Sequence, residues 1–221
     1  MRSLTSTLTA AQKAMSIAAL ARVVFSKTGQ TSLTYGTSRI LNLSHEEDRY
    51  GGSAEVTLDN SDDALTELDL RGYTGTISYG ATTSAGAEYS ACAPLIVIGH
   101  RLISARNVLT AEIYLASKFW LMKQDRASVY YVEDAASTNT VKTLFNAVAG
   151  ATLTVFNHCL AYTVVWDSED SLVDVFTPKD TFYVNENESR FNVLRKLLSW
   201  TTCIMRMEAD GSIHVRVPTT S

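Results

Sequence analysis

The last third of the chain has the pattern of one helix followed by one hairpin, and this pattern constrains the fold more than any other feature. Apolar residues recur at helical spacing across 188–200. The charged Arg190, Arg195 and Lys196 fall mostly off that stripe, as in a helix with one solvated side. Two runs of alternating residues then flank Asp210-Gly211, a dipeptide that favours the positive φ angles of a tight hairpin turn. The segment needs no catalytic residue and is typical of an assembly unit.

The composition predicts a folded protein without the excess positive charge that nucleic-acid binding requires. With 46% hydrophobic residues and three prolines in 221 residues, the chain can build one large or two modest cores. Its net charge of −4, from 19 basic and 23 acidic side chains, leaves no cationic surplus to neutralise phosphates. We therefore expect no sequence-specific binding of nucleic acid. No apolar run approaches the ~20 residues that cross a bilayer, so we expect no membrane anchor.

Cysteine and histidine spacing predicts neither a disulfide framework nor a metal or catalytic site. Cys92, Cys159 and Cys203 are odd in number and widely spaced, with no C-x-x-C pair, and we expect three buried thiols. The histidines belong to no recognised motif. The acidic turns at 59–63 and 167–170 lack the glycine and the distal glutamate of a calcium loop. We expect no catalytic residue, no metal and no cofactor.

The N-terminus has two interpretations. The Ala-rich stretch after Lys13 ends in Ala19-Leu20-Ala21, which fits the cleavage site of a secretory signal. Against that interpretation, a polar Ser/Thr-rich stretch separates Arg2 from a short, Ala-diluted apolar part. The alternative is a helix around residues 9–20 whose loose apolar face docks on a neighbour. We expect an N-terminal arm or helix over 1–20.

The remaining pattern predicts a β-rich α+β protein of two domains. Short strands with turn signals between them are typical of a sandwich or barrel, and they are expected at 22–26, 39–44, 54–58, 75–79, 94–102 and 108–115. A helix is expected at 140–149, where Gly150 stands at the C-terminal cap. We therefore expect a tube-like β-barrel or sandwich domain over 21–127, and a smaller α+β domain with the terminal helix and hairpin over 128–221.

The order of these features resembles that of bacteriophage tail proteins of the baseplate-hub and tail-tip type. The resemblance rests on a strand ending in Leu58-Asp59-Asn60, the helix at 140–149, and the Glu188-Ser189 helix with its Asp210-Gly211 hairpin. It covers most of the chain from Leu20 onward, although Asp63 stands where such proteins more typically have glycine. The resemblance implies a tube-like β-domain followed by a second domain.

The resemblance also implies a structural, non-enzymatic role in the virion tail, assembled in the host cytoplasm. In such a role, copies of the chain form a homo-oligomeric ring, a trimer or a hexamer, which joins the tail tube to other tail proteins. DNA can pass through the channel of that ring, and modest negative charge suits such a channel because a basic lumen would hold phosphates.

Two alternatives from other classes stay open: a carbohydrate-binding or hydrolytic module of phage or exported origin, and a bacterial β-domain adhesin. The first requires aromatic and carboxylate groups that converge in one cleft. For the ring, only interface candidates are named. In the N-terminal arm they are apolar residues without an evident local core: Leu4, Leu8 and Ile17. In the first domain they are the hydrophobic run Phe119, Trp120 and Leu121. The alternative for each residue is packing within its own chain.

Overall fold

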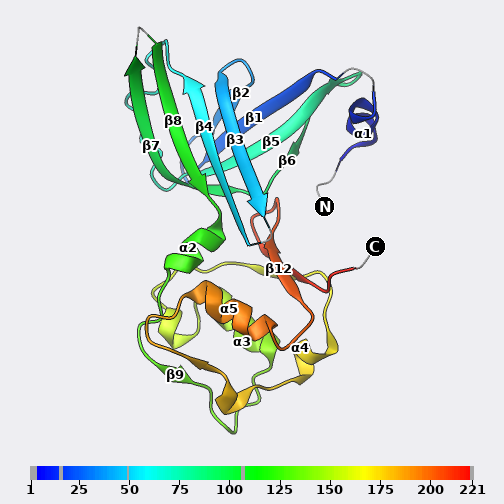
Figure 1. Cartoon of the computed structure of the whole chain (residues 1–221), viewed down its shortest axis with the longest axis vertical. Coiled ribbons are helices and arrows are strands. Elements are labelled where there is room, and N and C mark those ends of the chain that lie inside the picture. The colour runs from blue at the N-terminus through cyan, green and yellow to red at the C-terminus, as the bar shows by residue number, and fades with distance from the viewer. Residues whose placement is uncertain (1–3, 15–16, 49, 106–107, 220–221) are drawn as a thin grey trace. The chain divides into compact units, whose positions relative to one another are not determined.

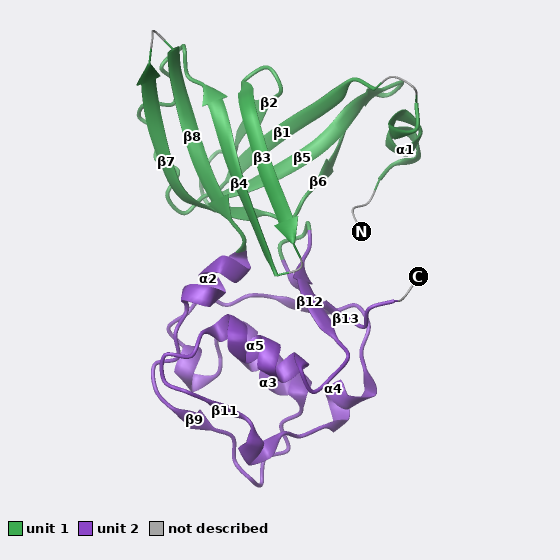
Figure 2. Cartoon of the chain, viewed as in Figure 1, with its two compact units in different colours: residues 1–117, 209–211 green, residues 118–208, 212–221 purple. Residues whose placement is uncertain are grey.

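The computed structural model describes residues 4–14, 17–48, 50–105 and 108–219, which form two compact units (Figures 1 and 2). The first unit comprises the described residues up to Ser117 together with Ala209–Gly211, and the second comprises the others. We expected the division after residue 127, whereas the helix Lys118–Gln124 (α2) groups with the second unit. No helix in the described ranges has the length and apolar character needed to cross a membrane.

The first unit contains a short helix and one eight-stranded antiparallel sheet. The strand order is β2-β1-β5-β7-β8-β4-β3, and β6 pairs with the second half of β5. The elements are α1 (Ser6–Gln12), β1 (Ala19–Ser26), β2 (Leu33–Gly36), β3 (Ile40–Asp48), β4 (Gly51–Asp59), β5 (Thr74–Thr83), β6 (Gly86–Ala91), β7 (Leu95–Ala105) and β8 (Val108–Ala116).

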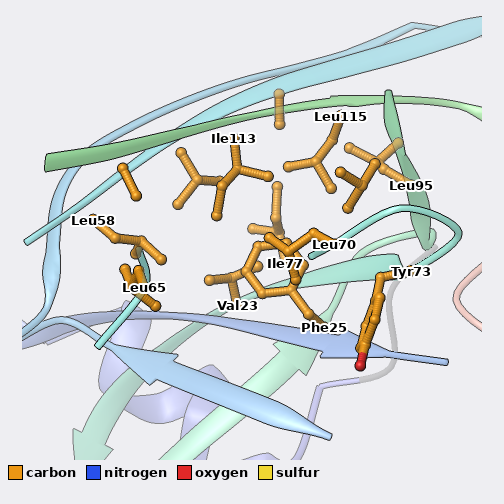
Figure 3. Close-up of a cluster of buried hydrophobic side chains, with 14 residues drawn as sticks. Val23, Phe25, Leu58, Leu65, Leu70, Tyr73, Ile77, Leu95, Ile113 and Leu115 are labelled. Atoms are coloured by element: carbon orange, nitrogen blue, oxygen red, sulfur yellow. The ribbon is translucent and has the colours of Figure 1, made fainter. Parts of the chain in front are cut away.

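The sheet curls around a single hydrophobic core. Alternating residues of β1, β4, β5, β7 and β8 point to the same side, as the two-residue period of a strand requires. Figure 3 shows Ile113 and Leu115 facing Val23 and Phe25 across this core. Leu70, from the loop between β4 and β5, fills the space between the two sides. The core therefore lies inside the curled sheet.

The curled sheet is open: β2 and β3 lie at the two ends of its strand order, and β6 pairs on one side, with β5. Within the described part of the chain no ladder pairs β2 with β3. The β-rich α+β class is confirmed, but the first unit is a curled open sheet rather than a closed barrel. Backbone groups along the outer sides of β2 and β3 are therefore available to another strand.

Some predicted elements of the first unit were wrong. The expected N-terminal helix is present but covers Ser6–Gln12 rather than 9–20, and Ala19 already belongs to β1. The helix starts at Ser6 because Thr5 caps it, accepting a hydrogen bond from the backbone N–H of Leu8 at 3.1 Å. The six expected strands are present, while β2 and β6 were not predicted.

The second unit packs small sheets and short helices around a second core. A three-stranded sheet has the order β10-β13-β12, and β11 pairs with β9. The elements are α2, β9 (Tyr131–Val132), α3 (Val141–Ala149), a 3₁₀ turn (Thr154–Phe156), β10 (Val164–Trp166), α4 (Ser171–Val175), a second 3₁₀ turn (Lys179–Thr181), β11 (Tyr183–Val184), α5 (Arg190–Leu198), β12 (Ile204–Met207) and β13 (Ile213–Arg216).

The terminal helix and hairpin are confirmed. Ser189 caps α5 by accepting a hydrogen bond from the N–H of Asn192 at 3.3 Å, and Gly211 takes the positive φ of 79° that the hairpin turn requires. Gly150 caps α3 as expected, although the positive φ falls on Ala151 at 55°. One expectation is wrong: Arg190 is completely buried rather than on the solvated side of α5.

Candidate assembly interfaces

The N-terminal arm contains one anchored and two exposed apolar residues. Leu8 is 1% exposed and holds α1 against the first unit, where α1 lies beside β5. Leu4 and Ile17 are 41% and 46% exposed. Of the three interface candidates in the arm, Leu8 therefore packs within its own chain, and Leu4 and Ile17 are available to a partner.

A polar clamp holds the start of the same arm. The hydroxyls of Thr5 and Thr7 each donate to the Glu88 carboxylate on β6 at 2.8 Å. A cavity of about 260 Å³ lies between α1 and the β5–β6 turn. Its lining is built from small, hydroxyl and aliphatic side chains: Thr7, Ala10, Ala11, Ala14, Ile17, Thr82, Thr83 and Ser84. The lining lacks the convergent carboxylates and aromatic rings of a carbohydrate cleft.

We expect Leu8→Ala to release the arm without unfolding the sheet. Losing a buried contact at the periphery costs at least about 1.4 kcal/mol, which is a factor of ten in the docking equilibrium. Limited proteolysis with trypsin should therefore cut about tenfold faster at Lys13, which follows α1 and is exposed. Leu4→Ala is the matched control because Leu4 is already exposed, and equal cleavage of both variants would show that Leu8 does not anchor the arm.

The three candidate residues on α2, Phe119, Trp120 and Leu121, differ in burial. Phe119 is 1% exposed and its ring lies 5.4 Å from that of Phe191 on α5. Trp120 is 40% exposed and Leu121 is half-buried. Phe119 therefore joins α2 to α5 inside the second unit, and Trp120 is the member of this cluster that a partner can reach.

The edges of the curled sheet are the second kind of candidate interface. The described residues of β3 are mostly exposed, and Leu41 is 56% exposed at a bulge in this strand. The strand ends in three exposed acidic residues, Glu46, Glu47 and Asp48. Charged residues on an edge strand disfavour indiscriminate pairing with other strands. The edge at β3 thus offers backbone groups for pairing, while its acidic end restricts which strand can pair with it.

A buried cation in the second unit was missed by the sequence analysis. Nη1 of Arg190 donates to the Leu160 carbonyl at 2.8 Å, and Nε lies 3.2 Å from Oδ2 of Asp125. The guanidinium carbon lies 4.8 Å from the ring centroid of Tyr162. These contacts join α5 to the end of α2 and to the segment before β10. The arrangement has a structural role, and no sequence motif predicts it.

The surroundings of Arg190 also raise the pKa values of two neighbouring side chains, Tyr162 and Cys159. Burial raises the pKa of the Tyr162 hydroxyl, and Arg190 offsets part of that rise. Burial also raises the pKa of the Cys159 thiol, and the nearby Asp125 carboxylate adds to the rise. Cys159 is therefore a less reactive thiol than an exposed one, since the thiolate is the nucleophile.

Two groups of potential metal ligands come together in the described residues, and neither was predicted. The first consists of His45, Glu47 and Cys92 in the first unit, and the second of Asp167, Glu208 and His214 in the second unit. The ligand atoms within each group lie within 4.8 Å of one another. None of the three cysteines forms a disulfide; Cys92 and Cys203 are buried as expected, and Cys159 is half-buried.

Comparison with known proteins gives matches in structure only. No protein-family model matches the sequence, and no curated protein matches it. The tail protein from Neisseria meningitidis MC58 superposes with a TM-score of 0.59 at 12% identity, over 88% of this chain and 50% of that chain. The 43 kDa tail protein of prophage MuSo2 from Shewanella oneidensis superposes with a TM-score of 0.53 at 11% identity, over 89% of this chain and 53% of that one.

A third similar structure comes from a protein complex. A chain of the lidded Francisella PdpA-VgrG complex superposes with a TM-score of 0.58 at 12% identity, over 98% of this chain and 30% of that chain. This chain therefore spans about half or less of the length of the proteins it resembles. The described fold, in both of its units, is one that the chain shares with bacterial and prophage tail proteins.

Proposed function

We propose that the protein is a non-enzymatic structural subunit of a phage tail tip or baseplate hub. Copies of the chain form an oligomeric ring that connects the tail tube to distal tip components. The main support is the open curled sheet with two free edges, β2 and β3, in a fold shared with tail proteins. A closed ring satisfies such edges because each copy offers one edge to each neighbour.

The partners of this subunit are further copies of itself and other tail proteins. A similar chain occurs in a PdpA-VgrG complex, which supports a role in binding other components of a tail-like machine. The ring belongs to the virion tail and is assembled in the host cytoplasm. DNA passes through its channel without sequence-specific contacts, in keeping with the net charge of −4.

We expect the wild-type chain to form a trimer or a hexamer, and Leu41→Glu to weaken that association at least about tenfold. Leu41 is 56% exposed in the single chain, so the change should leave the folded monomer intact. In a ring that pairs through β3, the new carboxylate would be buried without a partner, which costs more than the ~1.4 kcal/mol of a tenfold change. Native mass spectrometry over a concentration series measures the effect.

Leu160→Glu is the matched control for this test. Leu160 is a leucine of similar exposure, 68%, and it belongs to the second unit rather than to a sheet edge. We expect it to associate like the wild type. A wild-type chain that stays monomeric at high concentration, both alone and with tail-tube protein, would overturn the ring; equal weakening by both variants would overturn pairing through β3.

A further inference from the structure

Three side chains of different donor type meet in the first unit. His45 and Glu47 come from β3, and Cys92 follows β6. One nitrogen, one carboxylate oxygen and one sulfur from these residues lie within 4.8 Å of one another. Cys92 is distant in sequence from the other two residues, and the curling of the sheet brings it to them.

Strand geometry explains why two of the ligands point the same way. His45 and Glu47 are two positions apart on β3, so their side chains lie on one face of the strand. His45 pairs with Ala54 of β4, which is buried, so this face is turned toward the inside of the curled sheet. Cys92 is 1% exposed, and its N–H donates to the Ile77 carbonyl of β5 at 2.8 Å. This bond holds the backbone at Cys92 to the sheet.

The tyrosine beside the cluster can orient the imidazole. Nδ1 of His45 lies 3.2 Å from the hydroxyl of Tyr79, and the two rings stack with centroids 5.9 Å apart. The tautomer in which Nδ1 donates to this hydroxyl leaves a lone pair on Nε2. Metal-binding histidines commonly use one nitrogen for the metal and hold the ring with the other. Tyr79 is therefore placed as a positioning residue.

We propose that His45, Glu47 and Cys92 bind a divalent transition metal of the zinc type. A thiolate, an imidazole and a carboxylate form a donor set that zinc accepts, and three protein ligands leave a fourth position for water. Glu47 is exposed and His45 half-buried, so an ion can reach the site from solvent. Calcium and magnesium prefer oxygen ligands and suit a site containing a thiolate less well.

The other ligand group has a simpler explanation. His214 lies 2.9 Å from Asp167 as an ion pair or hydrogen bond, and Glu208 is ion-paired with Arg206 on the same strand ladder. These contacts account for all three side chains of that group. A cation there would have to displace Arg206 from Glu208, and that group contains no thiolate, the donor that selects for zinc-type ions.

A metal at this position would fasten the sheet across a gap in its strand order. β3 is an edge of the sheet, and β6 pairs only with β5 among the described strands. A metal held by ligands from β3 and from the residue after β6 therefore joins segments that no ladder joins. A ligand that binds only the folded state stabilises it, so metal should also protect the first unit against unfolding.

The test is a titration of the full-length, tag-free, reduced protein with Co²⁺, which reports thiolate ligation through a sulfur-to-cobalt absorption band, followed by competition with Zn²⁺. The wild type should show the band and lose it to Zn²⁺, and Cys92→Ser should lack it. Cys203→Ser is the matched control, because Cys203 is also buried and forms no disulfide, and this variant should keep the band.

A second pair of variants keeps the proposal testable if Cys92→Ser folds poorly. Glu47→Gln should weaken Zn²⁺ binding at least about tenfold, whereas Glu46→Gln, one position away on the opposite face of β3, should not. Tyr79→Phe should weaken it about 10- to 100-fold, the usual range for a group that orients a ligand. Absence of the cobalt–sulfur band in the wild type, or equal affinity of Glu47→Gln and Glu46→Gln, would overturn the proposal.

Discussion

Asp125→Ala is expected to lower the free energy of unfolding of the second unit by about 3–5 kcal/mol, because it leaves a buried charge without its counter-ion. Arg190 is fully buried, and its Nε and Nη2 have no hydrogen-bond partner among the described groups. The Asp125 carboxylate, 3.2 Å from Nε, supplies the opposing charge, and Leu160 binds only Nη1.

Tryptophan fluorescence in a urea titration measures the free energy of unfolding of the second unit. All three tryptophans, Trp120, Trp166 and Trp200, belong to the second unit. Asp174→Ala is the matched control, because Asp174 is 57% exposed beside Lys142, and exposed pairs contribute only about 0–1 kcal/mol.

A double variant separates the loss of a counter-ion from the loss of packing. Adding Arg190→Met to Asp125→Ala removes the uncompensated charge while keeping most of the buried volume. We therefore expect the double variant to be more stable than Asp125→Ala alone. If Asp125→Ala stays within about 1 kcal/mol of the wild type, Asp125 does not balance the buried charge of Arg190.

Arg190 also shows where reasoning from the sequence stops. The periodicity of 188–200 predicted the helix, and the serine before it marked the N-terminus, because both signals are local. The same pattern placed Arg190 on the wet side, since charged residues are almost never fully buried without a partner. Its partners, Asp125 and Leu160, come from distant segments, and no local pattern records them.

The strands show the same contrast between local sequence signals, which can be predicted, and tertiary pairing, which cannot. The six predicted strands alternate apolar and polar residues or form apolar runs, and they supply the core. The missed strands β2 and β6 are short and carry few large apolar residues, so their identity depends on pairing with β1 and β5. The arm was misjudged because its alanines favour a helix, while the pairing of Ala19 with Ala81 places residue 19 in a strand.

The candidate sites depended even more on tertiary structure. Leu4, Leu8 and Ile17 were grouped from composition, but only packing separates the buried Leu8 from its exposed neighbours. The ligands His45, Glu47 and Cys92 match no spacing motif, because motifs record ligands on one element and these come from two. The edges at β2 and β3 follow from the strand order, which depends on pairing between distant segments that no local pattern records.

Gly80→Ala is expected to break the β5–β6 ladder and to release the N-terminal arm with it. Gly80 pairs with Tyr89, and a Cβ at this position would lie 2.0 Å from the backbone oxygen of Glu88. A backbone atom in a ladder cannot move aside as a flexible side chain can. We expect a loss of about 3 kcal/mol, the upper end of the usual cost of overpacking. Because Glu88 also binds Thr5 and Thr7, displacing β6 removes the polar clamp on α1.

Hydrogen exchange followed by mass spectrometry distinguishes this coupled loss from a general destabilisation. In Gly80→Ala, amides of β6 and α1 should exchange faster together, while those of β4 and β8 stay protected. Gly36→Ala is the matched control, because Gly36 is also a strand glycine of the first unit and its added Cβ meets no atom within 4 Å. Faster exchange in β6 without any change in α1 would show that the arm is held by Leu8 alone, and identical exchange in the two variants would show that β6 accommodates the methyl group.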